Sequence, residues 1–543
     1  MQNQILENRE DLPRIAYFCM EYGLNEKFRI YSGGLGILAG DLMKTAREQD
    51  LPMVGIGIMW SKGYTKQLID DYGRPYDNFA SEEQNYQHVE DTGSTVSVMV
   101  DDEEITCRIW KVDKFDNNPI YLLDANLKQN GDKRWITERL YVGSSRERIA
   151  QEIVLGIGGV RALRKLGIDV DIYHFNEGHA ALAGTELIQE QMDDDTSFHE
   201  AWESVREHIV FTTHTPVKEG NESHPLENLE DMGAFNGLSP HQMEEIGGNP
   251  FNMTVAGLRL SSRANGVARL HGITARDMWN EVDNKAPIMS ITNGVHRQTW
   301  VDERMYDALF DRRKIKRFHQ ENKKNLLKYI AEENDQHLDE DQLLIGFARR
   351  AASYKRPDMI FWDMDTIRPL LEDDKIQVVF SGKAHPEDNI GKDIIANIVK
   401  ISRRFPENVV FLEDYNIEIG RLMTRGVDVW LNNPRRPLEA SGTSGMKAAM
   451  NGVLNLSTLD GWWAEACQHG INGWQFGDAY VGEGQDEHDL HALYDVLGNE
   501  VIPTYYKNRE RWLMMMQYSL KTTHDQFSAR RMLEDYYQML YQI

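Results

Sequence analysis

Short apolar runs rich in β-branched and aromatic residues alternate with helical patterns along most of this 543-residue chain. This alternation is typical of parallel sheets covered by helices, which places the chain in the α/β class. In the first half the expected strands are residues 15–20, 54–60, 120–124, 170–175, 209–213 and 288–292. In the second half they are residues 343–348, 376–381, 409–412, 427–431 and 453–456. We therefore expect two doubly wound, Rossmann-like domains with a ligand cleft between the carboxyl ends of their strands.

The chain is longer than one hydrophobic core usually supports, so more than one domain is expected. A stretch dense in Lys, Glu and Asp at residues 314–341 is interpreted as a solvated helix and connector between two lobes. The predicted division is an N-terminal Rossmann-like domain at 1–300, a C-terminal one at 301–505 and a C-terminal helical segment at 506–543.

Two local patterns depart from the simple alternation. Residues 94–112 indicate an antiparallel hairpin with Asp101 and Asp102 at its turn. The glycines of Gly156-Ile-Gly-Gly-Val resemble a dinucleotide-binding loop, but they continue a helical pattern instead of following a strand. Close helix packing is therefore the expected role of these glycines.

The charge of the chain limits its partners. Its 86 acidic against 60 basic side chains give a net charge of -26, which argues against nucleic acid or an anionic membrane as the main partner. A phosphate substrate is compatible with this charge, because salt screens charges farther away than about 8 Å. Binding of the anion then depends on nearby arginines and lysines.

The three cysteines, Cys19, Cys107 and Cys467, lie far apart and form no paired motif. The sequence therefore predicts neither a disulfide framework nor a metal site. The first ten residues lack a basic segment followed by an apolar one, and no run is long enough to span a bilayer. A cytoplasmic protein is expected, and a homo-oligomer is compatible with the sequence.

The segment Glu439-Ala-Ser-Gly-Thr-Ser-Gly-Met-Lys447 delivers one lysine from a turn of small residues into an apolar run. Small residues let backbone N–H groups approach an anion closely, and the start of the following helix favours negative charge. A lysine desolvated there can lose its proton and form an imine. Taken alone, a turn of this composition is more often an ordinary loop before a helix.

This nonapeptide is accompanied by Tyr31-Ser-Gly-Gly-Leu-Gly36, Phe347-Ala-Arg-Arg-Ala-Ala-Ser-Tyr-Lys-Arg356 and Ile291-Thr-Asn-Gly-Val295. Further blocks are Phe175-Asn-Glu-Gly-His-Ala-Ala-Leu182, Phe211-Thr-Thr-His-Thr-Pro216, Ala264-Asn-Gly-Val-Ala-Arg-Leu-His-Gly272, Ser381-Gly-Lys-Ala-His-Pro386 and Thr458-Leu-Asp-Gly461. In order and spacing, the set resembles the α-glucan (glycogen, starch, maltodextrin) phosphorylases in a short-chain form. The resemblance runs from about residue 14 to 477. It implies two domains of GT-B type facing each other across a central cleft, with a C-terminal helix returning to the first domain.

The resemblance implies that pyridoxal 5′-phosphate is attached as a Schiff base at Lys447. It assigns the cofactor phosphate to a set of small, cationic and phenolic residues, namely Gly33, Gly34, Arg349, Tyr415, Thr443, Ser444 and Gly445. The physical case agrees, because residues 32–36 precede a helical pattern and a helix N-terminus presents N–H groups to an anion. For the glycines alone, a tight strand-to-helix turn without a ligand stays an alternative.

A cluster of cations follows the predicted strand at 343–348. Arg349, Arg350, Lys355 and Arg356 fall within eight residues at the carboxyl end of that strand, where guanidinium groups suit phosphate oxygens. A solvated charge run is the usual alternative. By resemblance, Arg350 and Lys355 hold the substrate phosphate. Arg349 stands where long-chain family members carry lysine, and residues 351–353 also depart from their pattern.

Neutral groups and a carboxylate are expected to recognise sugar hydroxyls. By resemblance, His214, Asn293, Glu439 and Gly442 contact the transferred glucosyl unit, Tyr354 contacts the sugar, and Asn176, Glu177 and His179 line the acceptor side. The local alternatives are a turn asparagine at 293, a core histidine at 214, and pairing of Glu439 with Arg435 or Arg436. The catalytic set is then Lys447, Arg350, Lys355, Glu439, His214 and Asn293.

The implied activity is that of an α-1,4-glucan phosphorylase, a glycosyltransferase. It would convert the non-reducing end of an α-1,4-glucan or maltodextrin, with inorganic phosphate, reversibly into glucose 1-phosphate with retention of configuration. The spacing locates no carboxylate pair, so a phosphate-assisted front-face route is expected in place of a carboxylate nucleophile. Alternatives are a nucleotide-sugar-dependent glycosyltransferase resembling glycogen synthase, a glycoside hydrolase and a non-catalytic glucan-binding protein.

Overall fold

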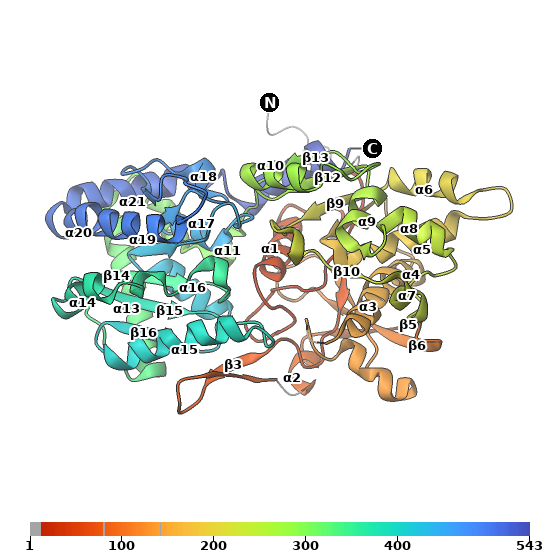
Figure 1. The fold of residues 1–543 in the computed structure, drawn as a ribbon, viewed down its shortest axis with the longest axis horizontal. Coiled ribbons are helices and arrows are strands. Elements are labelled where there is room, and N and C mark those ends of the chain that lie inside the picture. Colours follow the sequence, from red (N-terminus) through yellow and green to blue (C-terminus); the bar gives the residue numbers. More distant parts are fainter. Residues whose placement is uncertain (1–11, 80–81, 142, 543) are drawn as a thin grey trace. The chain divides into compact units, whose positions relative to one another are not determined.

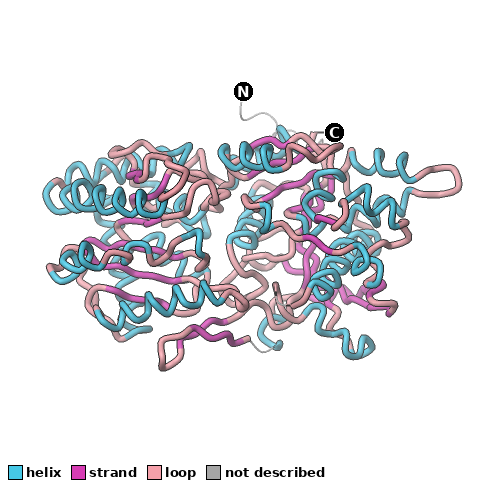
Figure 2. The backbone as a smooth tube through the Cα atoms, viewed as in Figure 1, coloured by secondary structure: helices cyan, strands magenta, loops and turns pink. Residues whose placement is uncertain are grey.

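Two large sheets, one of nine strands and one of six, organise the chain in this computed structural model (Figure 1). The structure describes residues 12–79, 82–141 and 143–542. These form two compact units. Unit 1 comprises the described residues among 1–64, 79–292 and 529–543, and unit 2 comprises 65–78 and 293–528. In both units the strands are flanked by helices (Figure 2), so the expected α/β class is confirmed.

The sheet of unit 1 is doubly wound. Its parallel strands are β1 (Ile15–Phe18), β2 (Met53–Ile58), β7 (Ile120–Asp124), β8 (Ile172–Asn176), β9 (Ile209–Thr213), β12 (Arg263–Gly266) and β13 (Ile288–Ser290). The antiparallel strands β5 (Glu90–Val100) and β6 (Glu103–Val112) extend it beyond β7, in the order β13-β12-β9-β8-β1-β2-β7-β6-β5. The chain therefore reverses its direction of winding between β1 and β8, which pair in parallel. The predicted hairpin is confirmed as β5 and β6.

The helices of unit 1 are α1 (Gly34–Glu48), α2 (Glu82–Tyr86), α3 (Ser145–Ile153), α4 (Gly159–Leu166), α5 (Leu182–Gln191), α6 (Phe198–Arg206), α7 (Leu226–Asp231), α8 (Pro240–Gly247), α9 (Met253–Leu260), α10 (Arg269–Met278) and α22 (Ala529–Asp535). A π-helical turn, Val154–Gly158, joins α3 to α4. A Cβ atom at Gly156 would stand 2.5 Å from the backbone nitrogen of Ala183. Gly156 therefore serves close helix packing, as predicted, and the segment lies within helical structure and forms no dinucleotide loop.

The C-terminal residues complete the core of unit 1. Helix α22 and the turn Tyr536–Leu540 bring Tyr541 to His174 of β8, where the Tyr541 hydroxyl lies 2.7 Å from Nδ1 of the imidazole. The Tyr536 and Tyr541 rings lie with their centroids 5.3 and 5.7 Å from that of His174. Burial lowers the pKa of His174 to about 3, so the ring is neutral in this aromatic setting.

The sheet of unit 2 is parallel throughout. Its strands are β14 (Leu343–Ala348), β15 (Ile376–Ser381), β16 (Val409–Leu412), β17 (Val429–Asn432), β18 (Leu454–Thr458) and β19 (Gly473–Phe476), in the order β16-β15-β14-β17-β18-β19. Numbered along the chain, this is the order 3-2-1-4-5-6 of a Rossmann sheet, and the winding reverses between β14 and β17. Alternate residues of β14 enter different cores, Leu343 and Ile345 one and Leu344 the other, as expected for a strand buried on both faces.

The helices of unit 2 are α11 (Arg297–Trp300), α12 (Glu303–Asp307), α13 (Arg312–Asn334), α14 (Met364–Glu372), α15 (Asn389–Arg404), α16 (Ile417–Gly426), α17 (Thr443–Ala449), α18 (Trp463–Ala466), α19 (Gln485–Val496), α20 (Ile502–Lys507) and α21 (Arg509–Thr523). The charged segment predicted as a solvated helix is largely α13, but this helix also buries Phe318, Lys323 and Leu326. The Lys323 ammonium pairs with Asp428 at 2.6 Å, so part of the charge run is partnered inside the fold.

A hairpin from the N-terminal half of the chain, β3 (Lys66–Ile69) and β4 (Pro75–Asn78), belongs to unit 2. Gln67 accepts a hydrogen bond from the Ala384 backbone at 2.9 Å, and Lys392 pairs with Asp77 at 2.6 Å. This hairpin is absent from the predicted strands, because its two strands are short and rich in polar residues. Among the described residues, no helix is long and apolar enough to cross a membrane.

The packing of the C-terminal residues predicts a large stability effect. Tyr541→Ala should lower the free energy of unfolding by about 3 kcal/mol, since a buried aromatic side chain is replaced by a cavity. Tyr541 is 1% exposed, whereas Tyr72 is 91% exposed and makes Tyr72→Ala the matched control. Urea denaturation of both variants measures the difference, and equal midpoints would contradict the packing described here.

Candidate active site

Most of the predicted site residues lie at or just beyond the carboxyl ends of strands. In unit 1, Asn176 ends β8, and His214 follows β9. In unit 2, Arg349 follows β14, and Glu439 lies in the loop after β17. Ligands of doubly wound sheets bind outside the carboxyl ends of strands where the winding reverses. In unit 2, predicted site residues thus follow both strands at the reversal, β14 and β17. In unit 1 they lie at the end of β8, which also flanks a reversal.

A buried carboxylate shared by two cations forms the centre of the unit 2 site. Glu439 Oε2 lies 2.7 Å from Nη2 of Arg349 and 2.8 Å from Nζ of Lys355, and each of the three side chains is at most 10% exposed. Burial opposes ionisation of Glu439, but the two cations outweigh it and hold the pKa of this carboxyl below its usual value. The alternative pairing of Glu439 with Arg435 or Arg436 is wrong, because Arg435 pairs with Asp486 and Arg436 donates to the Leu459 carbonyl. One carboxylate against two cations leaves positive charge for an anion.

Two further predicted residues adjoin this cluster. Arg350 is exposed and has no ion-pair partner in the described part of the chain. Tyr354 packs with its ring centroid 4.9 Å from Nζ of Lys355. A cation free of internal carboxylates at a strand end is suited to an oxyanion of a ligand.

Lys447 lies on helix α17, which begins after Gly442 in the left-handed conformation at φ 94°. The lysine is 5% exposed, and its Nζ lies 3.5 Å from the centroid of the Trp300 ring. The first turn contains Thr443, Ser444 and Gly445. A Cβ at position 445 would stand 2.7 Å from Asn455 Oδ1, so only glycine fits there.

The residues predicted to hold the cofactor phosphate in unit 2 fit such a group chemically. The buried Oγ of Ser444 has no hydrogen-bond partner among the described residues. Burial raises the pKa of Tyr415 to about 12, which keeps its hydroxyl protonated as a donor even beside Arg349. Nη2 of Arg349 lies 3.7 Å from the position that a Cβ of Gly442 would take. An unpartnered hydroxyl, a phenol and a guanidinium match the needs of a phosphate ester near a buried lysine.

The glycine loop of unit 1 lies over a carboxylate that the sequence analysis missed. Gly33 caps α1, and a Cβ at Gly33 or Gly34 would meet no atom within 4 Å. Glu21 Oε2 accepts hydrogen bonds from the Ser32 backbone at 2.5 Å and from that of Gly33 at 3.3 Å. Burial raises the pKa of Glu21, which favours its neutral form. The signal in the sequence is the position of Glu21 just after a buried strand.

Asn176, Glu177 and His214 are brought together by direct contacts. His214 Nε2 lies 2.7 Å from Asn176 Oδ1, and the His214 backbone donates to Glu177 Oε1 at 2.5 Å. The backbone of Glu177 has φ 76°, which is rare for residues other than glycine. Such strained backbone conformations are concentrated at functional sites. Burial lowers the pKa of His214 to about 3, so this imidazole is neutral at pH 7. His214 is half-buried and bonded to Asn176, so its role as a sugar contact and the alternative of a satisfied core histidine both stay predictions.

His179 adjoins a buried group of acids and bases. Its Nε2 lies 3.8 Å from Glu222, which Arg148 binds through Nη2 at 2.9 Å. Glu152, Glu222 and His224 bring ligand atoms within 4.8 Å of one another, a spacing suited to a metal ion. The Arg148 guanidinium already supplies positive charge there. The prediction that no metal takes part stays a prediction.

Asn293 and Asp460 complete the described site residues. Asn293 is buried at the start of unit 2. Asp460, which the sequence analysis quoted only within a motif, accepts hydrogen bonds from the backbones of Glu439 and Gly461 at 2.9 Å each. Burial, with the charge of Glu439 adding to it, raises the pKa of Asp460 to about 7. This carboxyl therefore fixes the backbone of Glu439.

Comparisons with known proteins agree with these observations. Residues 302–471 match the family described as carbohydrate phosphorylase. The maltodextrin phosphorylase of Thermococcus litoralis is 38% identical over 97% of this chain and 70% of its own length. The glycogen phosphorylase of Aquifex aeolicus is 36% identical over 97% of this chain and 86% of its own. An uncharacterised protein of Methanocaldococcus jannaschii is 34% identical over 97% of this chain and 99% of its own.

The two parallel-dominated sheets with cations at a strand-order reversal define a mixed α/β protein consistent with the GT-B class of fold. The similarity to these relatives covers nearly the whole chain. The chain belongs to the carbohydrate phosphorylase family. The family resemblance seen in its motifs is thereby confirmed.

The raised pKa of Asp460 predicts a pH-dependent stability difference. Between about pH 4 and 7 the folded state holds a proton on Asp460 that the unfolded state has lost, so this group makes stability fall as pH rises through that window. Asp460→Asn has no such titration. Between about pH 4 and 7 the free energy of unfolding of this variant, minus that of the wild type, should therefore increase by up to about 4 kcal/mol, at about 1.4 kcal/mol per pKa unit. Urea denaturation of both proteins at several pH values measures this change. A difference that is constant with pH would exclude the assigned titration.

Proposed function

We propose that the chain is an α-1,4-glucan phosphorylase, a glycosyltransferase of the glycogen and maltodextrin phosphorylase type. It transfers the glucosyl unit at the non-reducing end of an α-1,4-glucan or maltodextrin to inorganic phosphate, reversibly and with retention, giving glucose 1-phosphate. Family membership and the names of the relatives support this reaction. The observation that carries it is the buried cluster of Arg349, Lys355 and Glu439 at the strand-order reversal of unit 2.

Pyridoxal 5′-phosphate is the proposed cofactor. Lys447 would bind its aldehyde, and the cradle for its phosphate would comprise Gly33, Gly34, Arg349, Tyr415, Thr443, Ser444 and Gly445. The unpartnered Ser444 hydroxyl and the protonated Tyr415 support this assignment. When bound, the cofactor supplies a phosphate whose second ionisation lies near pH ~6, close enough to neutrality for proton exchange with a second phosphate.

The substrate phosphate is assigned to Arg350 and Lys355. Lys355 is held at Glu439 at 2.8 Å, and Arg350 keeps its charge unpaired within the described residues. Inorganic phosphate would therefore bind with one preorganised cation and one exposed cation. In the proposed front-face route, this phosphate protonates the leaving sugar oxygen and then attacks the sugar from the same face. Retention then needs no carboxylate nucleophile.

The glucan is assigned to neutral donors and acceptors with one ionised carboxylate. His214, Asn293, Glu439, Gly442 and Tyr354 would contact the transferred glucosyl unit. Asn176, Glu177 and His179 would line the acceptor side. A neutral His214 suits hydroxyl recognition because it adds no charge beside the cationic, oxocarbenium-like ring. The ionised Glu439 can accept a hydrogen bond from a sugar hydroxyl.

The finer architecture belongs to the same proposal. Two domains facing each other across a cleft, as in GT-B enzymes, would let residues of units 1 and 2 serve one reaction, and the family supports this arrangement. A cytoplasmic location and a homo-oligomeric state remain predictions. The alternative from the sequence is a nucleotide-sugar-dependent glycosyltransferase. Its reaction involves no imine, so it would not require the buried Lys447 on α17.

The role of Lys447 is tested by a matched pair of lysine variants. Lys447→Ala should release glucose 1-phosphate from maltoheptaose and phosphate at least a thousandfold more slowly than the wild type, because the cofactor loses its attachment. It should also lack the near-ultraviolet absorbance that shifts on borohydride reduction. Lys400→Ala, at an exposed position on α15, is the control and should match the wild type. Full activity of Lys447→Ala without the vitamin would refute the proposed mechanism.

The role of Arg350 is tested by kinetics. Arg350→Gln should raise the KM for phosphate by about 10- to 100-fold, because a charged hydrogen bond contributes about 1.5–3 kcal/mol. The KM for maltoheptaose should stay within about twofold. Arg404→Gln, at an exposed position on α15, is the matched control. An unchanged KM for phosphate in Arg350→Gln would remove this residue from the phosphate site.

A further inference from the structure

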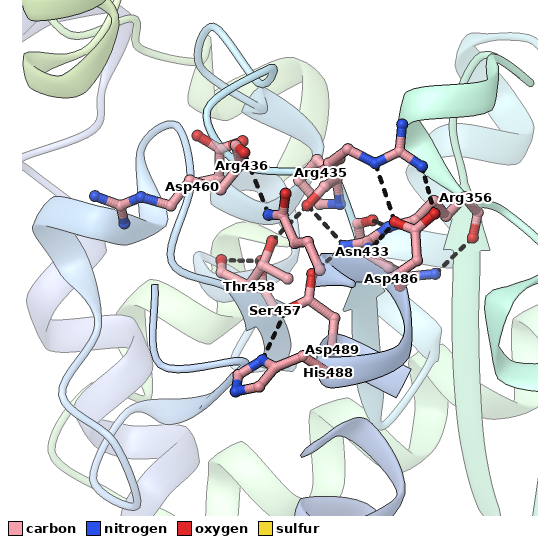
Figure 3. Close-up of polar contacts among 12 residues, drawn as sticks. Arg356, Asn433, Arg435, Arg436, Ser457, Thr458, Asp460, Asp486, His488 and Asp489 are labelled. Atoms are coloured by element: carbon pink, nitrogen blue, oxygen red, sulfur yellow. Dashed lines mark hydrogen bonds and ion pairs between the residues drawn. The ribbon is translucent and has the colours of Figure 1, made fainter. Parts of the chain in front are cut away.

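Arg356, the cation next to Lys355, is turned away from the Glu439 cluster and is fully buried. Its side chain is 0% exposed, and its backbone is left-handed at φ 47°. The guanidinium donates from Nε to the carbonyl of Asn433 at 2.7 Å and from Nη2 to that of Pro434 at 3.1 Å. Its Nη1 lies 3.0 Å from Asp486 and its Nη2 lies 2.7 Å from Asp489, both on α19 (Figure 3). One side chain thus binds two consecutive carbonyls beyond β17 and two carboxylates.

Two more hydrogen bonds join residues 354–356 to residues 433–435. Asn433 returns a hydrogen bond from its side-chain amide to the Arg356 carbonyl at 2.8 Å. The Arg435 backbone donates to the Tyr354 carbonyl at 2.8 Å. The turn at Ser353–Lys355 and the loop at 433–435 are therefore fastened to each other beside the reversal of strand order. The first carries Lys355, and the second continues to Glu439.

The loop at 433–439 is also held from its other side. Thr458 donates to the Pro434 carbonyl at 3.0 Å, Gln485 donates to the Arg436 carbonyl at 3.2 Å, and Arg436 donates to the Leu459 carbonyl. At its end, Asp460 receives the Glu439 backbone. With Arg356, these contacts leave the loop little freedom where it presents its carboxylate.

The choice of a buried arginine needs a reason beyond stability. A buried ion pair is weak evidence for stability, because desolvation of its charges offsets much of their attraction. A guanidinium offers several donors in a rigid planar fork, which an apolar side chain of similar volume lacks. That fork fixes the distance between two loops, and each of these loops bears one partner of the 2.8 Å contact between Lys355 and Glu439.

We propose that Arg356 is a positioning residue of the phosphate site, anchored by Asp489. By clamping the loop at 433–435 to the turn at Ser353–Lys355, it sets the position of the Lys355 ammonium relative to Glu439. The substrate phosphate then meets a cation whose place is already determined. Arg356 itself contacts no reacting group. This inference rests on the proposed function, because Lys355 is assigned there to phosphate.

The test compares Arg356→Lys and Asp489→Asn with Arg435→Gln. Arg435 is a matched control because its guanidinium binds the same Asp486 from a position that is 40% exposed. Three quantities are measured for each holoenzyme: the KM for phosphate, the KM for maltoheptaose, and the rise in melting temperature on adding inorganic phosphate.

Arg356→Lys should raise the KM for phosphate at least tenfold, with a smaller rise for Asp489→Asn. The KM for maltoheptaose should stay within about twofold, and the phosphate-dependent rise in melting temperature should shrink. Arg435→Gln should match the wild type in all three. If both test variants lose thermal stability but keep the wild-type KM for phosphate and the wild-type phosphate-dependent shift, Arg356 is merely structural and the inference is wrong.

Two outcomes separate this inference from the reaction it depends on. If the wild type binds phosphate in the melting assay but yields no glucose 1-phosphate, the proposed function fails, and the melting shifts of the variants still decide the role of Arg356. If Arg356→Lys does not fold, Asp489→Asn decides by the same measurements, since it weakens the anchor and leaves the guanidinium in place.

Discussion

The reversal of strand order between β14 and β17 is the constraint on which the unit 2 site depends. Parallel strands end at the same edge of a sheet, so the loops that follow β14 and β17 emerge side by side but wind in opposite directions. The first loop carries Arg349 and Lys355, and the second carries Glu439. The contact of one carboxylate with two cations is a consequence of that topology.

Electrostatics at the site runs against the charge of the whole chain. The protein carries a net charge of -26, yet its buried centre in unit 2 holds an excess of cations. Arg349, Lys355 and Glu439 partner one another there, as burial of charges requires. Arg356 illustrates the rule, because two carboxylates and two carbonyls surround its guanidinium. Local arrangement therefore outweighs overall charge in deciding what this site binds.

Sequence patterns predicted the elements that are apolar throughout and missed those that depend on distant partners. Strands β14, β15 and β16 match their predicted bounds, since runs such as residues 343–348 are buried on both faces. The β3–β4 hairpin has no clear sequence pattern, because Gln67 and Asp77 are polar and their partners outside the hairpin, Ala384 and Lys392, lie more than 300 residues away along the chain. The position of Glu21 and Asp460 after a strand is only a weak signal in the sequence, because many carboxylates follow strands and only the fold shows which backbone N–H groups these two bind. The roles of Lys447 and Arg350 remain predictions.

The sequence by itself determined the α/β class, the family and the residue types at the strand ends, because periodicity and short motifs are local properties of the chain. Only the tertiary structure decided which charges meet. It paired Glu439 with Arg349 and Lys355 instead of its neighbours Arg435 and Arg436, and it gave Arg356 to Asp486 and Asp489. The physical reason is that ion pairing depends on distance and burial in space, and these follow from sheet topology, not from separation along the chain.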